Sequence, residues 1–346
     1  MSKKDPLQRR ASIPRLVALV DARVLSPEAW ERACQIAGHT PREQSWIKFI
    51  SRAILTLGVV FIISGVVFFS AYNWVEPHRF VVFGSIQAIM LGLVAFIHFW
   101  GIDNLLGKLA LLAASMLIGV LLAVIGQEYQ TGADAYQLFG YWALLMIAWV
   151  VVARWGPLWL VWLVIVNIAM SLYGEQIVGE HRDAGIFIAA IVLNGAALAA
   201  WEWGQTRAID WLQARWIPSL FGTAILALAT YLVIDWLFFD GYYDWQTQTY
   251  QDSRYFALYL APFVYVVVIV GIVAAYYRWK HDLFMLSASG VSLIVLTTAV
   301  IGFWFEEYVD GAEMVACLAG IVIIAETGAL ASVLLHLHNR WEEGEI

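Results

Sequence analysis

Long apolar runs alternate with short polar segments along most of the chain. After residue 49, about ten such runs follow one another, and each is long enough to cross the hydrocarbon core of a bilayer as a single α-helix. The expected spans are residues 50–71, 78–100, 105–127, 136–153, 157–174, 184–203, 215–235, 255–277, 283–304 and 312–335. The pattern therefore predicts an all-α fold, a polytopic transmembrane helical bundle.

The polar first segment predicts a short helical hairpin instead of a span. Residues 12–14 can start one helix, and Ser26, Pro27 and Glu28 form a stronger second start. Serine is a preferred N-cap, proline fits the first helical position, and an acid suits the first turn. We therefore expect three parts: a cytoplasmic helical hairpin (1–48), a transmembrane helical bundle (49–338) and a cytoplasmic tail (339–346).

Composition supports a membrane environment. Of the 346 residues, 62% are hydrophobic and 14% are charged, whereas soluble domains are roughly half apolar and a quarter charged. A soluble fold of this length cannot bury so much apolar surface away from water, whereas in a bilayer that surface can contact lipid. The formal net charge of −7 argues against nucleic acid as a partner. The lipid bilayer is the expected surrounding.

Motifs for common chemistries are absent from the sequence. It contains no P-loop, GxSxG, HExxH or GxGxxG pattern, and these patterns carry nucleotide, acyl-transfer, zinc and dinucleotide chemistry. Cys34 and Cys317 lie far apart in the chain and indicate neither a disulfide framework nor a metal site. We expect no catalytic residue, no cofactor and no metal, and therefore not an enzyme.

Charges in the loops predict the orientation. Cytoplasmic loops of membrane proteins carry an excess of Lys and Arg. Basic residues gather in the N-terminal segment and in alternate loops, at Lys108, Arg154, Arg207, Arg215, Arg278, Lys280 and Arg340. The opposite loops are acidic, with Glu76, Asp134, Glu175, Glu180, Asp183, Asp240, Asp244, Asp252, Glu306, Glu307, Asp310 and Glu313. This alternation predicts ten spans with both termini in the cytoplasm.

One stretch is more specific than general hydrophobicity. Residues 125–134 read IGQEYQTGAD and are followed by YQLF at 136–139. This stretch resembles the central signature of the bacterial membrane family labelled domain of unknown function 2157. The helical start around residues 16–28 and the AYNW sequence at 71–74 are also similar to that family, so the resemblance covers roughly residues 10–170. It implies a location in the bacterial inner membrane and leaves the activity open.

The outer end of the third span carries the first group of candidate site residues. Small and polar residues recur there at every fourth position, at Ser115, Gly119, Ala123 and Gln127, and such a face allows close approach of helices. Glu128 lies at the boundary, and Asp134 precedes the next helix as an N-cap. Gln127, Glu128 and Asp134 either form a polar vestibule for a cation or proton, or hold a tight loop together.

Glu326 is the most specific single candidate for a functional residue, because it lies near the middle of the last expected span. A charged side chain at that depth costs roughly 2.5–3.5 kcal/mol on insertion scales, so it should face other helices and have a partner. It is either a proton or cation relay or a protonated acid bonded to a neighbouring helix. Gln87, His98, Asn167 and Asn194 are the candidate polar neighbours, although an ordinary hydrogen bond between helices is the better interpretation of each.

Two further features lie at the membrane surfaces. The outer segment 236–254 is dense in aromatic and acidic residues, and Asp240, Asp244 and Trp245 are candidates for binding a sugar, a lipid headgroup or a cation. The alternative is an interfacial aromatic belt. Glu202, at the cytoplasmic end of the sixth span, is expected only to position that end at the interface.

These observations favour a binding or assembly subunit of a membrane complex, with a membrane-protein partner. The alternative is a proton- or cation-coupled transporter or channel that uses Glu326 and the outer vestibule from Glu128 to Asp134. An enzyme that acts on a lipid-linked substrate comes third.

Overall fold

The computed structural model describes residues 13–37, 40, 43–72, 79–130, 132–178, 184–238, 242–244, 249–251, 260–308 and 312–343. The chain divides into two compact units, Met1–Pro77 and His78–Ile346. Each unit is described by itself.

The first unit contains the predicted hairpin and one long helix. Helices α1 (Ile13–Asp21) and α2 (Pro27–Ile36) pack together, and α3 (Glu43–Tyr72) follows. The backbone N–H of Ala29 donates to Ser26 Oγ at 3.2 Å, which confirms the predicted N-cap. Helix α3 contains the expected span 50–71, and its 30 residues correspond to about 45 Å of helix.

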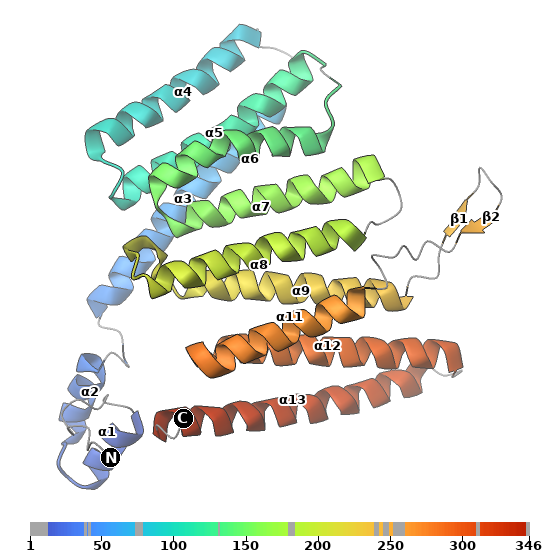
Figure 1. Cartoon of the computed structure of the whole chain (residues 1–346). Helices are drawn as coiled ribbons and strands as arrows, with labels where there is room; N and C mark the ends of the chain where they lie inside the picture. The colour runs from blue at the N-terminus through green and yellow to red at the C-terminus, as the bar shows by residue number, and fades with distance from the viewer. Residues whose placement is uncertain are drawn as a thin grey trace. The chain divides into compact units, whose positions relative to one another are not determined.

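The second unit is built from membrane-length helices (Figure 1). They are α4 (Arg79–Trp100), α5 (Leu105–Glu128), α6 (Ala135–Ala153), α7 (Gly156–Tyr173), α8 (Ala184–Thr206), α9 (Trp216–Phe238), α11 (Ala261–Ala275), α12 (Leu283–Tyr308) and α13 (Ala312–Glu343). Short π-helical turns, η2 (Gly174–Val178) and η4 (Tyr276–Lys280), extend α7 and α11, and a 3-10 turn, η3 (Asp210–Leu212), precedes α9. Within the described residues, nine helices are long and apolar enough to span a membrane.

The predicted spans and these helices agree closely. The expected segment 78–100 is α4, and 105–127 is α5 apart from its last residue. Helix α11 begins at Ala261 with a proline in its first turn, later than the expected start at 255, because proline suits a first turn. The nine spans do not include α3, so the count of ten stays a prediction.

A short hairpin is the exception to the all-α expectation. Strands β1 (Tyr242–Asp244) and β2 (Thr249–Gln251) pair antiparallel inside the acidic and aromatic segment that follows α9. Tyr243 lies opposite Tyr250 in the register. Two strands of three residues each do not form a sheet that is stable on its own. The hairpin is therefore part of a loop in a helical protein.

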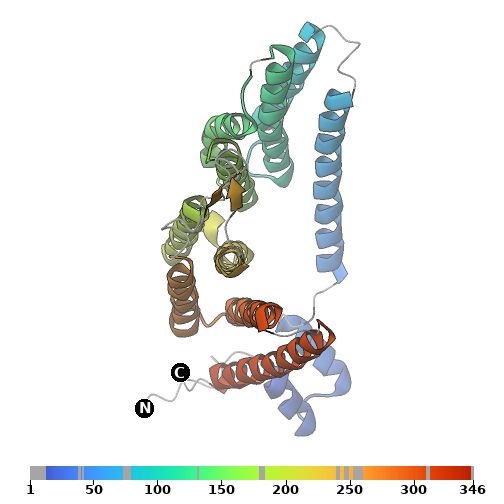
Figure 2. The same cartoon turned by 90° about the vertical axis from the view of Figure 1, so that its right-hand side faces the viewer.

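The helices of the second unit follow one another along a curved row (Figures 1 and 2). Most of their contacts join helices that are consecutive in the chain. Helix α9 is the exception, because it contacts α7, α8, α11 and α12. The main buried cluster lies around it and includes Ile225, Leu232, Tyr265 and Met285.

A close approach of α5 and α6 depends on the predicted small residues. An ideal Cβ at Gly119 would lie 2.5 Å from the Trp142 ring, so only glycine leaves room for the indole. Trp142 Nε1 donates to the carbonyl of fully buried Ser115 at 2.9 Å. The expected helix contact through Ser115 and Gly119 is therefore confirmed, with Trp142 as the residue that fills the gap.

Polar side chains inside the spans pair with one another across helices. Asn194 Nδ2 on α8 donates to Asn167 Oδ1 on α7 at 2.8 Å. The hydroxyl of Ser292 on α12 lies 2.7 Å from that of Thr230 and 3.0 Å from that of Tyr265. Such bonds hold helices together where lipid offers no alternative partner.

Replacing Gly119 by leucine tests the seam between α5 and α6. The added side chain collides with Trp142, so the free energy of unfolding should fall by about 1–3 kcal/mol, as for overpacked cores. Unfolding in SDS of the detergent-solubilised protein measures it. Gly92→Leu on α4 is the matched control, because nothing lies within 4 Å of a Cβ there. Equal stability of the two variants would contradict the proposed seam.

Candidate functional site

The ends of α8 and α11 meet the loops that start α9 and α12. After α8, Ala208 adopts a left-handed φ of 52° and η3 turns the chain into α9. After α11, the π-helical turn η4 closes at His281, which has a φ of 51°. Wide π turns recur at functional sites, and this one brings polar side chains toward α8.

Glu202 on α8 joins two residues of η4. The Tyr276 hydroxyl donates to Glu202 Oε1 at 2.8 Å, and the Lys280 ammonium forms an ion pair with Glu202 Oε2. The Tyr276 residue is only 4% exposed, whereas the side chains of Lys280 and Glu202 are 34% and 20% exposed. Because both contacts are charge-assisted, they fix the end of α11 to α8.

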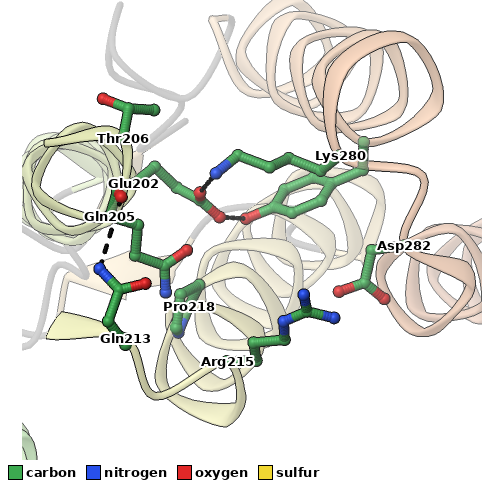
Figure 3. A pocket seen from close by; sticks show the side chains of 9 residues that line it. Glu202, Gln205, Thr206, Gln213, Arg215, Pro218, Lys280 and Asp282 are labelled. Carbon is green, nitrogen blue, oxygen red and sulfur yellow. Dashed lines mark hydrogen bonds and ion pairs between the residues drawn. The ribbon is translucent and has the colours of Figure 1, made fainter. Parts of the chain in front are cut away.

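The contacts of Glu202 with Tyr276 and Lys280 form a bridge between α8 and η4. A polar cavity of about 280 Å³ lies on one side of this bridge (Figure 3). Its lining comes from α8, α9, η4 and the loops between them, namely Glu202, Gln205, Thr206, Gln213, Arg215, Pro218, Tyr276, Lys280 and Asp282. Asp282 Oδ1 accepts the backbone N–H of Phe284 at 2.9 Å and so caps α12. Arg215 points toward Asp282 in Figure 3. The cavity thus contains two cationic and two anionic side chains.

An apolar groove of about 450 Å³ lies along α8 and α11 and shares the bridge with the polar cavity. Its walls are Ile191, Gly195, Leu198 and Ala199 of α8 and Val267, Val268, Gly271, Ile272 and Ala275 of α11, with Ile225 of α9 between them. Glu202, Tyr276 and Lys280 line the groove as well as the cavity. The charged bridge therefore closes one end of an apolar channel.

A wider cleft of about 1,040 Å³ lies between α7, α8 and α9. Its lining is mostly apolar, with the Asn167–Asn194 pair, Ser171, Glu175 and Tyr231 as polar members. Because these two asparagines satisfy each other, they act as links between helices. This confirms the interpretation of Asn167 and Asn194 as an ordinary interhelical pair, and it removes them as partners of Glu326.

Glu326 contacts the neighbouring helix instead. The Thr297 hydroxyl on α12 donates to Glu326 Oε2 at 2.8 Å, and Glu326 is half-buried. The expectation that this acid faces another helix and has a partner is therefore confirmed. Glu326 does not line the polar cavity, the apolar groove or the wider cleft.

The candidate residues of the outer vestibule lie at the end of α5 and at the start of α6. Gln127 is exposed and Glu128 is half-buried at the end of α5. Asp134 occupies the N-cap position of α6, but its side chain makes no capping hydrogen bond. Instead Gln176 Oε1 of η2 accepts the N–H of Tyr136 at 3.2 Å. Glu128 on α5 and Glu326 on α13 belong to helices near opposite ends of the row in Figure 1.

The predicted outer-loop ligand residues are only partly described. Asp240 and Trp245 lie outside the described residues, and Asp244 ends β1 opposite Thr249. Within the described part of the chain, no three His, Cys, Asp or Glu side chains are grouped closely enough to hold a metal ion.

The bridge around Glu202 is the feature that sequence reasoning missed. Glu202 was expected only to position a helix end, and its partners lie 74 and 78 residues away, at Tyr276 and Lys280. The one available signal was an acid and a lysine at ends of spans on the same expected side. That signal does not say which spans are neighbours.

Comparison with known proteins identifies the N-terminal part of the chain. Residues 18–159 match the family described as Predicted membrane protein (DUF2157), which confirms the resemblance based on residues 125–139. No curated protein and no solved structure gives a significant match. The match and the nine spans together make this a polytopic membrane protein, and the family description names no activity.

A double-mutant cycle tests the bridge. Tyr276→Phe removes a hydrogen bond to a charged group and should cost about 1.5–3 kcal/mol of unfolding free energy. Combined with Lys280→Met, the two losses should be non-additive by about 0.5–3 kcal/mol, because both residues contact Glu202. Unfolding in SDS measures each variant.

Tyr277→Phe is the matched control for this cycle. Tyr277 is the adjacent residue, and its side chain is 37% exposed beside the Trp341 ring, so the change should stay within about 0.5 kcal/mol. Strict additivity of Tyr276→Phe and Lys280→Met would show that the two contacts do not act together.

Proposed function

We propose that this polytopic membrane protein is an assembly subunit of a membrane complex and that α13 is the helix through which it meets a further subunit. The single observation that supports this is the exposed face of α13. Within the described residues, no position of its most apolar stretch is buried inside the chain.

One face of α13 packs on α12. Glu326, Leu330, Leu334 and Leu337 are its less exposed residues and recur at helical spacing. An ideal Cβ at Gly290 of α12 would lie 2.3 Å from Leu330, so glycine is needed there for close packing. This face is therefore already used by the chain itself.

The opposite face of α13 has a shallow centre of small residues. Ala325, Gly328, Ala331 and Ser332 are all exposed on it, with Ile324 at 75% and Leu335 at 63% exposed toward its two ends. Nothing lies within 4 Å of a Cβ at Gly328. Small residues let a second helix backbone approach closely in a membrane, whereas lipid chains need no such shape. A helix of another subunit is the occupant that this face favours.

Cross-linking tests the assembly proposal. Ser332→Cys in a Cys317→Ser background places a single exposed thiol on the small-residue face, because the remaining Cys34 is buried. A membrane-permeable maleimide–diazirine cross-linker, coupled to this thiol in native membranes and then illuminated, should give an adduct larger than the monomer, because its carbene inserts into any neighbouring side chain. Its mass tells whether the partner is a second copy or another protein.

Two further substitutions make the adduct diagnostic. Gly328→Leu fills the shallow centre and should abolish the adduct, whereas Gly328→Ala should keep it. Ser85→Cys on α4 is the control for exposure alone, because Ser85 is also exposed. An adduct that forms equally from Ser85→Cys, or that survives Gly328→Leu, would rule out α13 as the interface.

The proposal includes a location and an orientation. The resemblance at residues 125–139 supports a bacterial inner membrane, and the alternation of basic and acidic loops supports both termini in the cytoplasm. No catalytic step is part of the role. Cys317, which is exposed at the start of α13, then lies at the outer surface. Its labelling by a membrane-impermeant maleimide in spheroplasts tests the orientation.

The second candidate function is proton- or cation-coupled transport, and Glu326 is the observation that favours it. A carboxylate within a span is a functional candidate by default, and its bond to Thr297 gives it one fixed partner. If Glu326 carries protons or cations, Glu326→Gln should reduce ion flux into reconstituted vesicles at least about tenfold. Thr297→Val is the companion variant, and flux unchanged by Glu326→Gln would contradict the role.

A further inference from the structure

We propose that the groove between α8 and α11 binds one acyl chain of a phospholipid with a primary-amine zwitterionic headgroup, and that Glu202 and Lys280 bind the headgroup. This site is independent of the α13 face, because it is built by α8, α9, α11 and η4.

The length of the groove matches one leaflet of a bilayer. On α8 it extends from Ile191 to Glu202, and eleven residues of helix rise about 16 Å. The hydrocarbon core is about 30 Å thick, so the groove spans about half of it, starting from a charged end. Its volume of about 450 Å³ lies within the usual range of about 300–1,000 Å³ for ligand sites.

Small residues face each other across the groove. Gly195 and Ala199 lie one turn apart on α8, and Gly271 and Ala275 lie one turn apart on α11. Nothing lies within 4 Å of a Cβ at Gly195 or Gly271. The missing side chains leave a continuous channel over Ile225 of α9, and the channel suits a linear apolar chain.

The groove is open along its length and polar at one end. Gly271 and Ala199 are exposed, and Val267 is 54% exposed. At the charged end, the Trp279 residue is 79% exposed. Tryptophan is enriched at membrane–water interfaces, so this end of the groove suits the level of the headgroups. An acyl chain entering from the bilayer would therefore keep its headgroup at the level of Glu202 and Lys280.

The charges at this end select a zwitterion. Glu202 and Lys280 carry opposite charges and pair with each other, so the site has no net charge to attract an anionic lipid. A headgroup with a phosphate and a primary ammonium can replace that internal pair by two external ones, phosphate to Lys280 and ammonium to Glu202. The ammonium has three N–H donors, whereas the quaternary amine of choline has none.

Native mass spectrometry of the full chain tests the site. The protein, purified in detergent, is titrated with phosphatidylethanolamine, phosphatidylglycerol and phosphatidylcholine that have the same acyl chains. We expect phosphatidylethanolamine to bind about tenfold more tightly than the other two. Gly271→Leu, which fills the groove, and Lys280→Gln, which removes the phosphate partner, should each weaken its binding by about tenfold.

Matched controls separate the site from general effects. Gly92→Leu adds the same side chain to the open face of α4, and Lys108→Gln removes a lysine from the start of α5, so both should bind like the wild type. If Gly271→Leu does not fold, Gly195→Leu fills the groove from the other wall.

Two results would overturn the proposal. Phosphatidylethanolamine binding that is unchanged by filling the groove would exclude the groove as its site. Equal binding of the three lipids by the wild-type protein would exclude headgroup selection by Glu202 and Lys280.

Discussion

The hydrocarbon of a bilayer offers no hydrogen-bond partner, so a chain inside it must satisfy its own polar groups. Helices do this for the backbone, and hydroxyl side chains in the spans do it by donating one turn back. Ser115 donates to the carbonyl of Leu111, Thr230 to that of Leu226 and Ser289 to that of Met285. Contacts between helices must therefore come largely from shape. Glycines supply that shape where a larger side chain lies against them, as Trp142 does at Gly119 and Leu330 does at Gly290.

Polar chemistry reappears where the helices end. The Glu202 carboxylate comes from the end of α8, and the Tyr276 hydroxyl and the Lys280 ammonium come from the π-helical turn that extends α11. Together they close the apolar groove and line the polar cavity. One set of side chains thus lines a polar cavity on one side and an apolar groove on the other. This position allows the bridge to stabilise the fold and also to interact with a molecule that is itself half polar.

The sequence was enough to predict the elements but not their partners. Apolar runs marked α4 and α5 to within a residue, and Ser26 with Pro27 marked the start of α2. These features are local, because a span must be long and apolar and a helix start must be capped. The bonds of Glu202 to Tyr276, of Glu326 to Thr297 and of Gln176 to Tyr136 are not local. They depend on which helices are neighbours. The hydropathy of a span does not reveal this, because sides that face lipid and sides that face another helix are both apolar.

The row of consecutive helix contacts has a consequence for biogenesis. Because α5 packs on α4, α6 on α5 and α7 on α6, each helix that leaves the insertion machinery finds its neighbour already in place. Contacts that are close in sequence form quickly, and chains fold from the N-terminus during synthesis. Helix α9 departs from this order, since it also contacts α12, and α12 begins only after more than 40 further residues have been translated. Tertiary assembly of this unit therefore ends with α11 and α12 closing onto α9, which was inserted before them, and with α13 then packing on α12.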